Sequence, residues 1–150
     1  MIKSSRQAMA RNGDTSPFAL GLLLRRAHRR VATAMAEALR PFGVELRHFA
    51  VLLVVVERGP TQQRDLVEAT GFDKAGIMRV VDDLERQGLA VRKAVPGDRC
   101  VRAVEITKKG LELFDAAHVA AAPMADQLVS ALTPSEVAQL RSLLTRFTEH

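Results

Sequence analysis

Basic side chains recur in two neighbouring segments of the sequence, spaced so that they could form one cationic surface. They are Lys74 and Arg79 in the first segment, and Arg92, Lys93, Arg99 and Arg102 in the second. Lysine and arginine bind phosphate oxygens, and arginine can also donate two hydrogen bonds to one guanine edge. The chemistry that these residues could perform is therefore the binding of nucleic acid.

The first basic segment is predicted to lie on an amphipathic helix over residues 74–87. Its apolar positions follow the i, i+3, i+4, i+7 spacing of one helix face: Ile77, Val80, Val81 and Leu84. Asp73 can cap the N-terminus of this helix. The solvent side then offers the candidate contacts Lys74, Ala75, Gly76, Met78 and Arg79.

The elements around this helix form an informative order. Thr61 can cap a short helix through residue 70, and Gly71-Phe72-Asp73 is predicted to be a tight turn before the second helix. Residues 89–95 and 101–106 are rich in β-formers, and the turn residues 96–99 between them predict a β-hairpin. This order is typical of a helix-turn-helix with a wing, in which the second helix enters the major groove.

Long amphipathic helices are predicted on both sides of this unit. Ser16 and Pro17 can start a helix that ends near residue 40, and Thr107 can cap another that runs to residue 132, with a kink or break at Pro123. Residues 133–136 form a capping box for a last helix over 134–148. Residues 46–58 are ambiguous because three valines favour a strand, but the length of the segment favours a buried helix.

Residues 60–112 resemble the core of MarR-type regulators. The resemblance rests on residues 64–74, on the "LE-x-x-GL" pattern at residues 84–89, on Asp98-Arg99 at the hairpin tip, and on "I-T-K-K-G" at residues 106–110. It implies a mainly α fold with a small β-hairpin wing, a winged helix-turn-helix with N- and C-terminal dimerisation helices. The expected organisation is a basic arm (1–15) and one domain (16–150), with a DNA-binding part (46–106) and dimerisation helices (16–40 and 107–150).

The resemblance further implies a homodimeric transcriptional repressor. Such a protein binds a palindromic operator in double-stranded DNA and is released by a small-molecule effector. The single cysteine, the polar N-terminus and the short apolar runs indicate the cytoplasm. The dimer has separate support, since several apolar side chains of the last two helices would be exposed on a monomer: Leu111, Phe114, Leu128, Leu132, Leu140, Leu144 and Phe147. Alternatives are an interaction module that keeps the fold without specific DNA readout, and a regulator that responds to thiol oxidation.

The sequence departs from the family pattern in its proposed DNA contacts. At the hairpin tip the family commonly reads Asp-x-Arg, whereas this chain has Cys100 in the arginine position, so Arg99 or Arg102 would have to replace that contact. Ala75, Gly76 and Met78 offer no side-chain hydrogen bonds, although Ala75 or Met78 could touch a thymine methyl group. Base readout is therefore expected to depend on Arg79 and Lys74.

Three further residues are weaker candidates for chemistry. Cys100 lies between two arginines, which would favour a reactive thiolate, so it is a candidate redox site. Arg47 and His48 lie where ligand pockets of the family tend to be lined, and they could equally be packing or surface residues. The acids Asp82 and Asp83 are adjacent on a helix and point about 100° apart, which indicates a charged helix surface rather than a catalytic pair.

The composition agrees with a small DNA-binding protein. The 150 residues fit one domain, and 47% of them are hydrophobic. The net charge of +5 favours nucleic-acid binding. The longest apolar run, residues 49–56, is too short for a membrane span, and the polar N-terminus predicts no secretory signal. The histidines and the cysteine do not have the spacing of metal ligands, so no metal site or cofactor is predicted. The sequence also offers no convergent pair of carboxylates, so no enzymatic activity is predicted.

Overall fold

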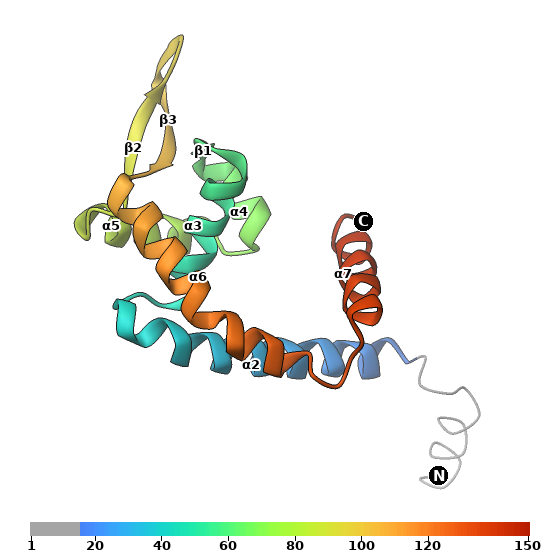
Figure 1. The fold of residues 1–150 in the computed structure, drawn as a ribbon. Helices are drawn as coiled ribbons and strands as arrows, with labels where there is room; N and C mark the ends of the chain where they lie inside the picture. Colours follow the sequence, from blue (N-terminus) through green and yellow to red (C-terminus); the bar gives the residue numbers. More distant parts are fainter. Residues whose placement is uncertain (1–15) are drawn as a thin grey trace, which may run out of the picture. The chain divides into compact units, whose positions relative to one another are not determined.

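The computed structural model describes residues 16–150, so the predicted basic arm, residues 1–15, lies outside the described residues. The chain divides between Ala34 and Met35 into two units. The elements, labelled in Figure 1, are α2 (Pro17–Leu39), a 3-10 turn (Arg40–Phe42), α3 (Leu46–Arg58), β1 (Thr61–Gln62), α4 (Gln63–Thr70), α5 (Lys74–Arg86), β2 (Ala90–Val95), β3 (Asp98–Ile106), α6 (Lys108–Leu128) and α7 (Pro134–Thr148).

The core of the second unit lies where α3, α4 and α5 meet. The four apolar residues predicted for α5, namely Ile77, Val80, Val81 and Leu84, are all buried. They pack in one cluster with Leu52 and Val55 of α3 and Leu66 of α4. The ambiguous segment at residues 46–58 is a helix, because its apolar residues recur with helical spacing and five of its side chains are buried.

The small sheet differs from the prediction. It is a three-stranded antiparallel sheet in the order β1-β3-β2, in which Thr61 pairs with Val104 and Gln62 with Ala103. Thr61 is therefore a buried strand residue whose hydroxyl donates to the Gly59 carbonyl, and the prediction that it caps the following helix is wrong. Helix α4 begins two residues later, with Gln62 in the cap position.

The hairpin of β2 and β3, residues 90–106, is called the wing below. It projects from the α3–α5 cluster (Figure 1). The register shifts between Ala94, which pairs with Arg102, and Val95, which pairs with Asp98. Residues 99–101 therefore bulge from β3, and the Asp98 carboxylate accepts the backbone N–H of Cys100 at 2.9 Å within this bulge.

Helix α6 begins as the sequence predicted, but it does not break at Pro123. Thr107 caps it as expected, accepting the N–H of Gly110 at 3.0 Å. The helix continues through Pro123 and ends at Leu128, so no break occurs at the proline. The carbonyl that loses its donor is that of Val119, whose side chain is 74% exposed, so water can reach this side of the helix.

The apolar residues of α6 and α7 divide between core and surface. Phe114 was expected on an exposed stripe, but it is buried and stacks on Phe49 at a centroid distance of 4.8 Å. Leu111 is exposed, as is Leu132 in the loop that follows α6. Helix α7 has the predicted capping box, in which Thr133 and Glu136 exchange hydrogen bonds, and it buries no residue.

Within residues 16–150, no helix combines the length and the apolar character that crossing a bilayer requires. In the same part of the chain, no cluster of three histidine, cysteine or acidic side chains is placed to hold a metal ion.

Candidate DNA-binding surface

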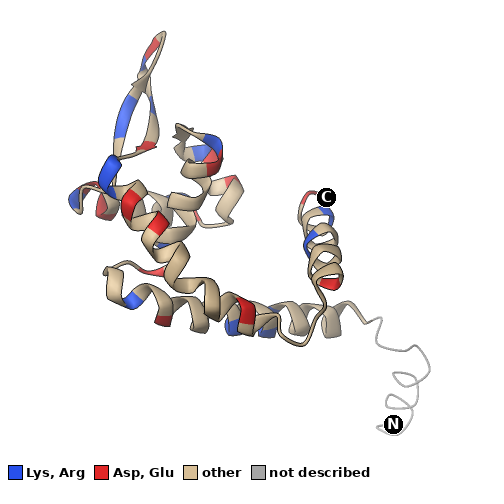
Figure 2. Cartoon of the chain, in the orientation of Figure 1, with Lys and Arg blue, Asp and Glu red and all other residues tan. Residues whose placement is uncertain are grey.

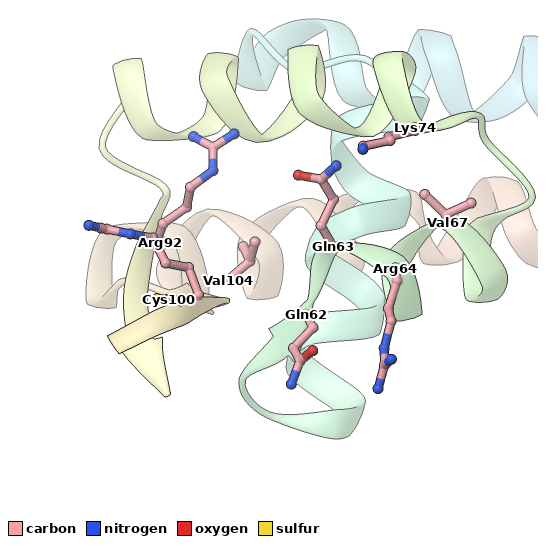
Figure 3. A pocket seen from close by; sticks show the side chains of 9 residues that line it. Gln62, Gln63, Arg64, Val67, Lys74, Arg92, Cys100 and Val104 are labelled. Atoms are coloured by element: carbon pink, nitrogen blue, oxygen red, sulfur yellow. The ribbon is translucent and has the colours of Figure 1, made fainter. Parts of the chain in front are cut away.

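A cleft with a cationic lining lies between the helix-turn-helix and the wing. Its volume is about 660 Å³. The lining residues come from four segments: Gln62, Gln63, Arg64 and Val67 around the start of α4, Lys74 at the start of α5, Arg92 on β2, and Cys100, Arg102 and Val104 on β3 (Figure 3). None of these lining residues is acidic, so the cleft concentrates positive potential and attracts anions.

The alternation of side chains along β3 decides which wing residues line this cleft. Arg102 and Val104 are two residues apart on the regular part of β3 and face it together, as a strand requires, and Cys100 lines it from the bulge. Arg99 is exposed at the wing tip and does not line the cleft. Of the two arginines considered as substitutes for the missing tip arginine, Arg102 is therefore the one that shares the face of Cys100.

Two of the cleft cations have no acidic partner within residues 16–150. Among the described residues, Lys74 and Arg102 take part in no ion pair, and Arg64 makes only a long contact of 3.7 Å with the neighbouring Asp65. Helices α4 and α5 also begin at the cleft, which adds the partial positive charge of their N-termini. Figure 2 shows basic segments along the wing.

The outer side of α5 presents the other predicted contacts. Ala75, Met78 and Arg79 are exposed, and Gly76 is half-buried beside the cap residue. The Asp73 carboxylate accepts the N–H of Gly76 at 2.6 Å, and a Cβ at position 76 would lie 2.8 Å from the same oxygen. Gly76 therefore allows the close capping contact that fixes the start of α5, which offsets its unfavourable helix propensity.

Strand β1 and helix α4 also contribute to this surface, which the sequence did not predict. Gln62, Gln63 and Arg64 line the cleft, but no periodicity or motif marked them as contacts. The one available signal was their place at the start of the first helix of the helix-turn-helix. Lys93 points elsewhere: its ammonium group pairs with Glu105 across the wing at 3.3 Å, and it does not line the cleft.

Two adjacent acids of α5 hold the helix against two different neighbours. The sequence predicted only that they form a charged helix surface. Asp82 pairs with Arg92 of β2 at 2.7 Å, and Asp83 contacts His48 of α3 at 3.2 Å. Because adjacent helix residues point in different directions, the two carboxylates reach two different neighbours. The position of α5 relative to both α3 and the wing is therefore specified by side-chain contacts as well as by the core.

His48 has a structural role in this arrangement. Its ring is buried, Nδ1 accepts the backbone N–H of Glu45 at 3.1 Å, and Nε2 lies 3.2 Å from Asp83. Since Nδ1 is an acceptor, the proton is on Nε2 and is donated to the carboxylate. Both nitrogens are occupied within the chain, so the predicted ligand contact of His48 would have to displace one of these bonds.

The hydrogen bond from His48 holds the pKa of Asp83 below its ordinary value of 3.8, and the guanidinium groups of Arg86 and Arg47 act in the same direction against desolvation. A lowered carboxyl pKa means that the charged form stabilises the fold above the unfolded-state value, and that this stability is lost as the pH falls through the folded-state value. We expect Asp83→Asn to lower the free energy of unfolding at neutral pH, and the difference from wild type to close below pH 3.8.

Urea unfolding of both proteins across this pH range measures the difference. The control is Asp126→Asn on α6, an exposed acid in no ion pair of the described residues, which should give no pH-dependent difference. A gap for Asp83→Asn that stays constant with pH would show that the carboxylate charge does not contribute.

Cys100 and Arg47 occupy different cavities. Cys100 is a free, exposed cysteine in the lining of the cationic cleft, and its predicted redox role stays a prediction. Arg47 borders a separate cavity of about 250 Å³ together with Phe72, Asp73, Gly76 and Val80.

Comparison with known proteins identifies the family. A profile of the MarR family matches residues 42–99. The HTH-type transcriptional regulator MhqR of Bacillus subtilis is 31% identical over 127 residues, which cover 85% of this chain and 88% of that protein. The HTH-type transcriptional repressor NicR of Pseudomonas putida is 29% identical over 141 residues, covering 91% and 89%.

The fold has solved counterparts as well. The crystal structure of CouR from Rhodococcus jostii RHA1, bound to p-coumaroyl-CoA, matches with a TM-score of 0.78 and 30% identity, over 86% of this chain and 91% of that one. MhqR and NicR are transcriptional regulators, which agrees with the expectation that the chain is not an enzyme. The chain is a member of the MarR family, a transcriptional regulator with a winged helix-turn-helix.

Proposed function

We propose that this regulator is a homodimeric repressor that binds a palindromic operator and is released by a small-molecule effector. The observation that carries the proposal is the cationic cleft between α4, α5 and the wing, whose lining includes Lys74 and Arg102, two cations without an ion pair within residues 16–150. A DNA strand that follows the cleft would place one phosphate run against these cations while α5 enters the adjacent major groove. The DNA-binding part would span residues 46–106.

The predicted contacts then divide by their chemistry. Lys74 and Arg102 neutralise phosphates in the cleft, and Arg99 adds charge at the wing tip, whereas Lys93 is held in its ion pair with Glu105. Arg79, exposed on α5, is proposed to read a guanine edge. Ala75, Gly76 and Met78 lack polar side-chain groups, so they allow close approach to the groove floor and contact with thymine methyl groups.

The dimer is supported by exposed apolar side chains on the helices that flank the DNA-binding part, residues 16–40 and 107–150. On α2 the exposed fraction reaches 85% at Phe18 and 63% at Leu22, and on α7 it is 58% at Phe147. Large apolar side chains gathered on one element mark an interface rather than a solvated surface. A two-fold dimer would present two α5 helices to half-sites about one DNA turn apart.

The repressor and effector parts of the proposal are supported by the relatives. NicR is named a repressor, and CouR was solved with p-coumaroyl-CoA, an anionic aromatic thioester. Arg47 is the candidate effector contact in this chain, since it borders a cavity next to the start of α5. Effector binding would act by favouring a state in which the two α5 helices no longer match the half-sites, so its affinity must differ between the two states.

The test is a DNA titration of wild type and Arg79→Ala. The probes are the duplex upstream of the chain's own gene and a random duplex of the same length, over a range of salt concentrations. We expect wild type to prefer the upstream duplex and Arg79→Ala to weaken this binding by about 10- to 100-fold, the effect of one lost bidentate base contact. Arg141→Ala, a charge-matched change on α7, should leave both affinities unchanged.

The pattern of loss identifies the role of Arg79. A loss confined to the upstream duplex, with an unchanged salt slope, supports base readout. A uniform loss on both duplexes, with the salt slope reduced by about 0.9, would make Arg79 a phosphate contact instead. Equal wild-type affinity for both duplexes would contradict the proposed operator at this place and favour a module without specific DNA readout.

A further inference from the structure

Arg92 of β2 is the cleft arginine that differs most from its neighbours. Its side chain is only 23% exposed and extends from the wing toward α5 (Figure 3). One guanidinium nitrogen lies 2.7 Å from Asp82, and another lies 2.8 Å from Glu85. The basic pattern of the sequence predicted Arg92 to contact DNA, but these pairs commit its charge to two carboxylates of the same chain.

The same contact also fixes the backbone of the wing. The N–H of Arg92 donates to Glu85 Oε1 at 2.7 Å, while its guanidinium donates to Glu85 Oε2. Asp82 and Glu85 are three residues apart on α5 and so share one helix face. Two charge-assisted hydrogen bonds to Glu85 and an ion pair with Asp82 thus join one residue of β2 to one face of α5. Charge-assisted bonds are stronger and more directional than neutral ones.

The charges of this contact oppose the function that we propose for the surface. Asp82 is 53% exposed and lies on the helix that would enter the major groove, where carboxylates repel DNA phosphates. Two acids against one arginine leave a net negative charge at this point. If Arg92 served as a phosphate contact, removal of the acids would release it and strengthen DNA binding.

We propose that Arg92 is a positioning residue, which with Asp82 and Glu85 holds the wing at a fixed angle to α5. The inference rests on the proposed DNA-binding function. The contact between Arg92 and the two acids would let α5 contact the major groove while the wing contacts the DNA backbone. Wing and helix then approach DNA as one preformed surface, so the cost of ordering the wing does not reduce affinity for the operator.

The decisive variant removes the acids and keeps the arginine. In Asp82→Asn with Glu85→Gln, two negative charges are lost, so electrostatics alone would strengthen binding to every duplex. We expect binding to random duplex to strengthen or stay unchanged. Binding to the operator should weaken about tenfold, the effect of losing one charge-assisted pair. The charge-matched control is Glu112→Gln with Asp115→Asn, two exposed acids of α6, for which the ratio of operator to random affinity should not fall.

Removal of the arginine gives the complementary result. Arg92→Ala should weaken operator binding with the salt slope unchanged, because no phosphate contact is lost. When it is added to the double acid variant it should have little further effect, since the three residues act as one unit. Arg92→Lys, which keeps the charge but not the fork geometry, should recover only part of the affinity. A salt slope reduced by about 0.9 in Arg92→Ala would overturn the proposal.

A measurement without DNA separates this proposal from the proposed function. We expect amide hydrogen exchange of residues 92–102 in the free protein to rise in Arg92→Ala and in the double acid variant, while α3 stays protected. Unchanged exchange in the wing would overturn the positioning role, whatever the DNA result. Faster exchange combined with equal wild-type binding to all duplexes would support the contact between wing and helix and contradict the DNA-binding function.

Discussion

Replacing Gly110 by alanine is expected to lower the free energy of unfolding by about 3 kcal/mol, at the upper end of the usual cost of overpacking. Gly110 is buried in the first turn of α6, where the helix crosses the base of the wing. A Cβ there would overlap the carbonyl oxygen of Leu89 and lie 2.8 Å from Cγ1 of Ile106. The neighbour is backbone, so relief requires α6 to move away from the wing.

The displacement would also weaken two hydrogen bonds at this junction. The Leu89 carbonyl accepts the N–H of Thr107 at 3.1 Å, and the Thr107 hydroxyl donates to the Gly88 carbonyl at 2.7 Å. Urea unfolding measures the loss. The control is the same substitution at Gly21 in α2, where a Cβ meets no atom within 4 Å, and there alanine should raise stability by roughly 0.5–1 kcal/mol. Wild-type stability of Gly110→Ala would contradict the packing at this junction.

The second large effect is expected at the proposed dimer interface. Leu140 and Leu144 are 45% and 38% exposed and share one face of α7. Replacing both with glutamate places two charges where an apolar surface would be buried, so the dimer should dissociate. Operator affinity should then fall by about 100-fold or more, because each half-site would be bound alone. Sedimentation and DNA titration at equal protein concentration measure the two consequences.

A charge-matched control exists on the opposite face of the same helix. Ala138→Glu with Ser142→Glu adds the same charge at the same spacing, and it should leave the dimer and the operator affinity unchanged. If the wild-type chain is monomeric, or if the leucine variant still binds the operator with wild-type affinity, the proposed interface is wrong.

Features that depend on a few neighbouring residues could be predicted from the sequence. The buried face of α5 follows from apolar spacing, and the caps at Asp73, Thr107 and Thr133 follow from a polar side chain placed three residues before a backbone N–H. Fold class and family could be predicted as well, because the order of elements and several motifs agree.

Features that arise from distant pairing could not be predicted. Strand β1 has two residues and exists only because it pairs with Val104 and Ala103, some forty positions later. The burial of Phe114 depends on Phe49, and an apolar stripe does not state which neighbour covers it. Arg92 matched the basic pattern of its segment, but its acidic partners on α5 decide whether its charge is available to DNA. The cleft at the start of α4 appears only when the four segments come together.

The measurement that tests the central claim most directly is selection of bound duplexes from a random DNA library by the wild-type protein, followed by sequencing. We expect enrichment of an inverted repeat whose half-sites are centred about one helical turn apart, on the order of 10 base pairs. A pool that stays random in sequence although the protein binds it would contradict specific readout by a dimer. Binding would then reflect the positive surface alone.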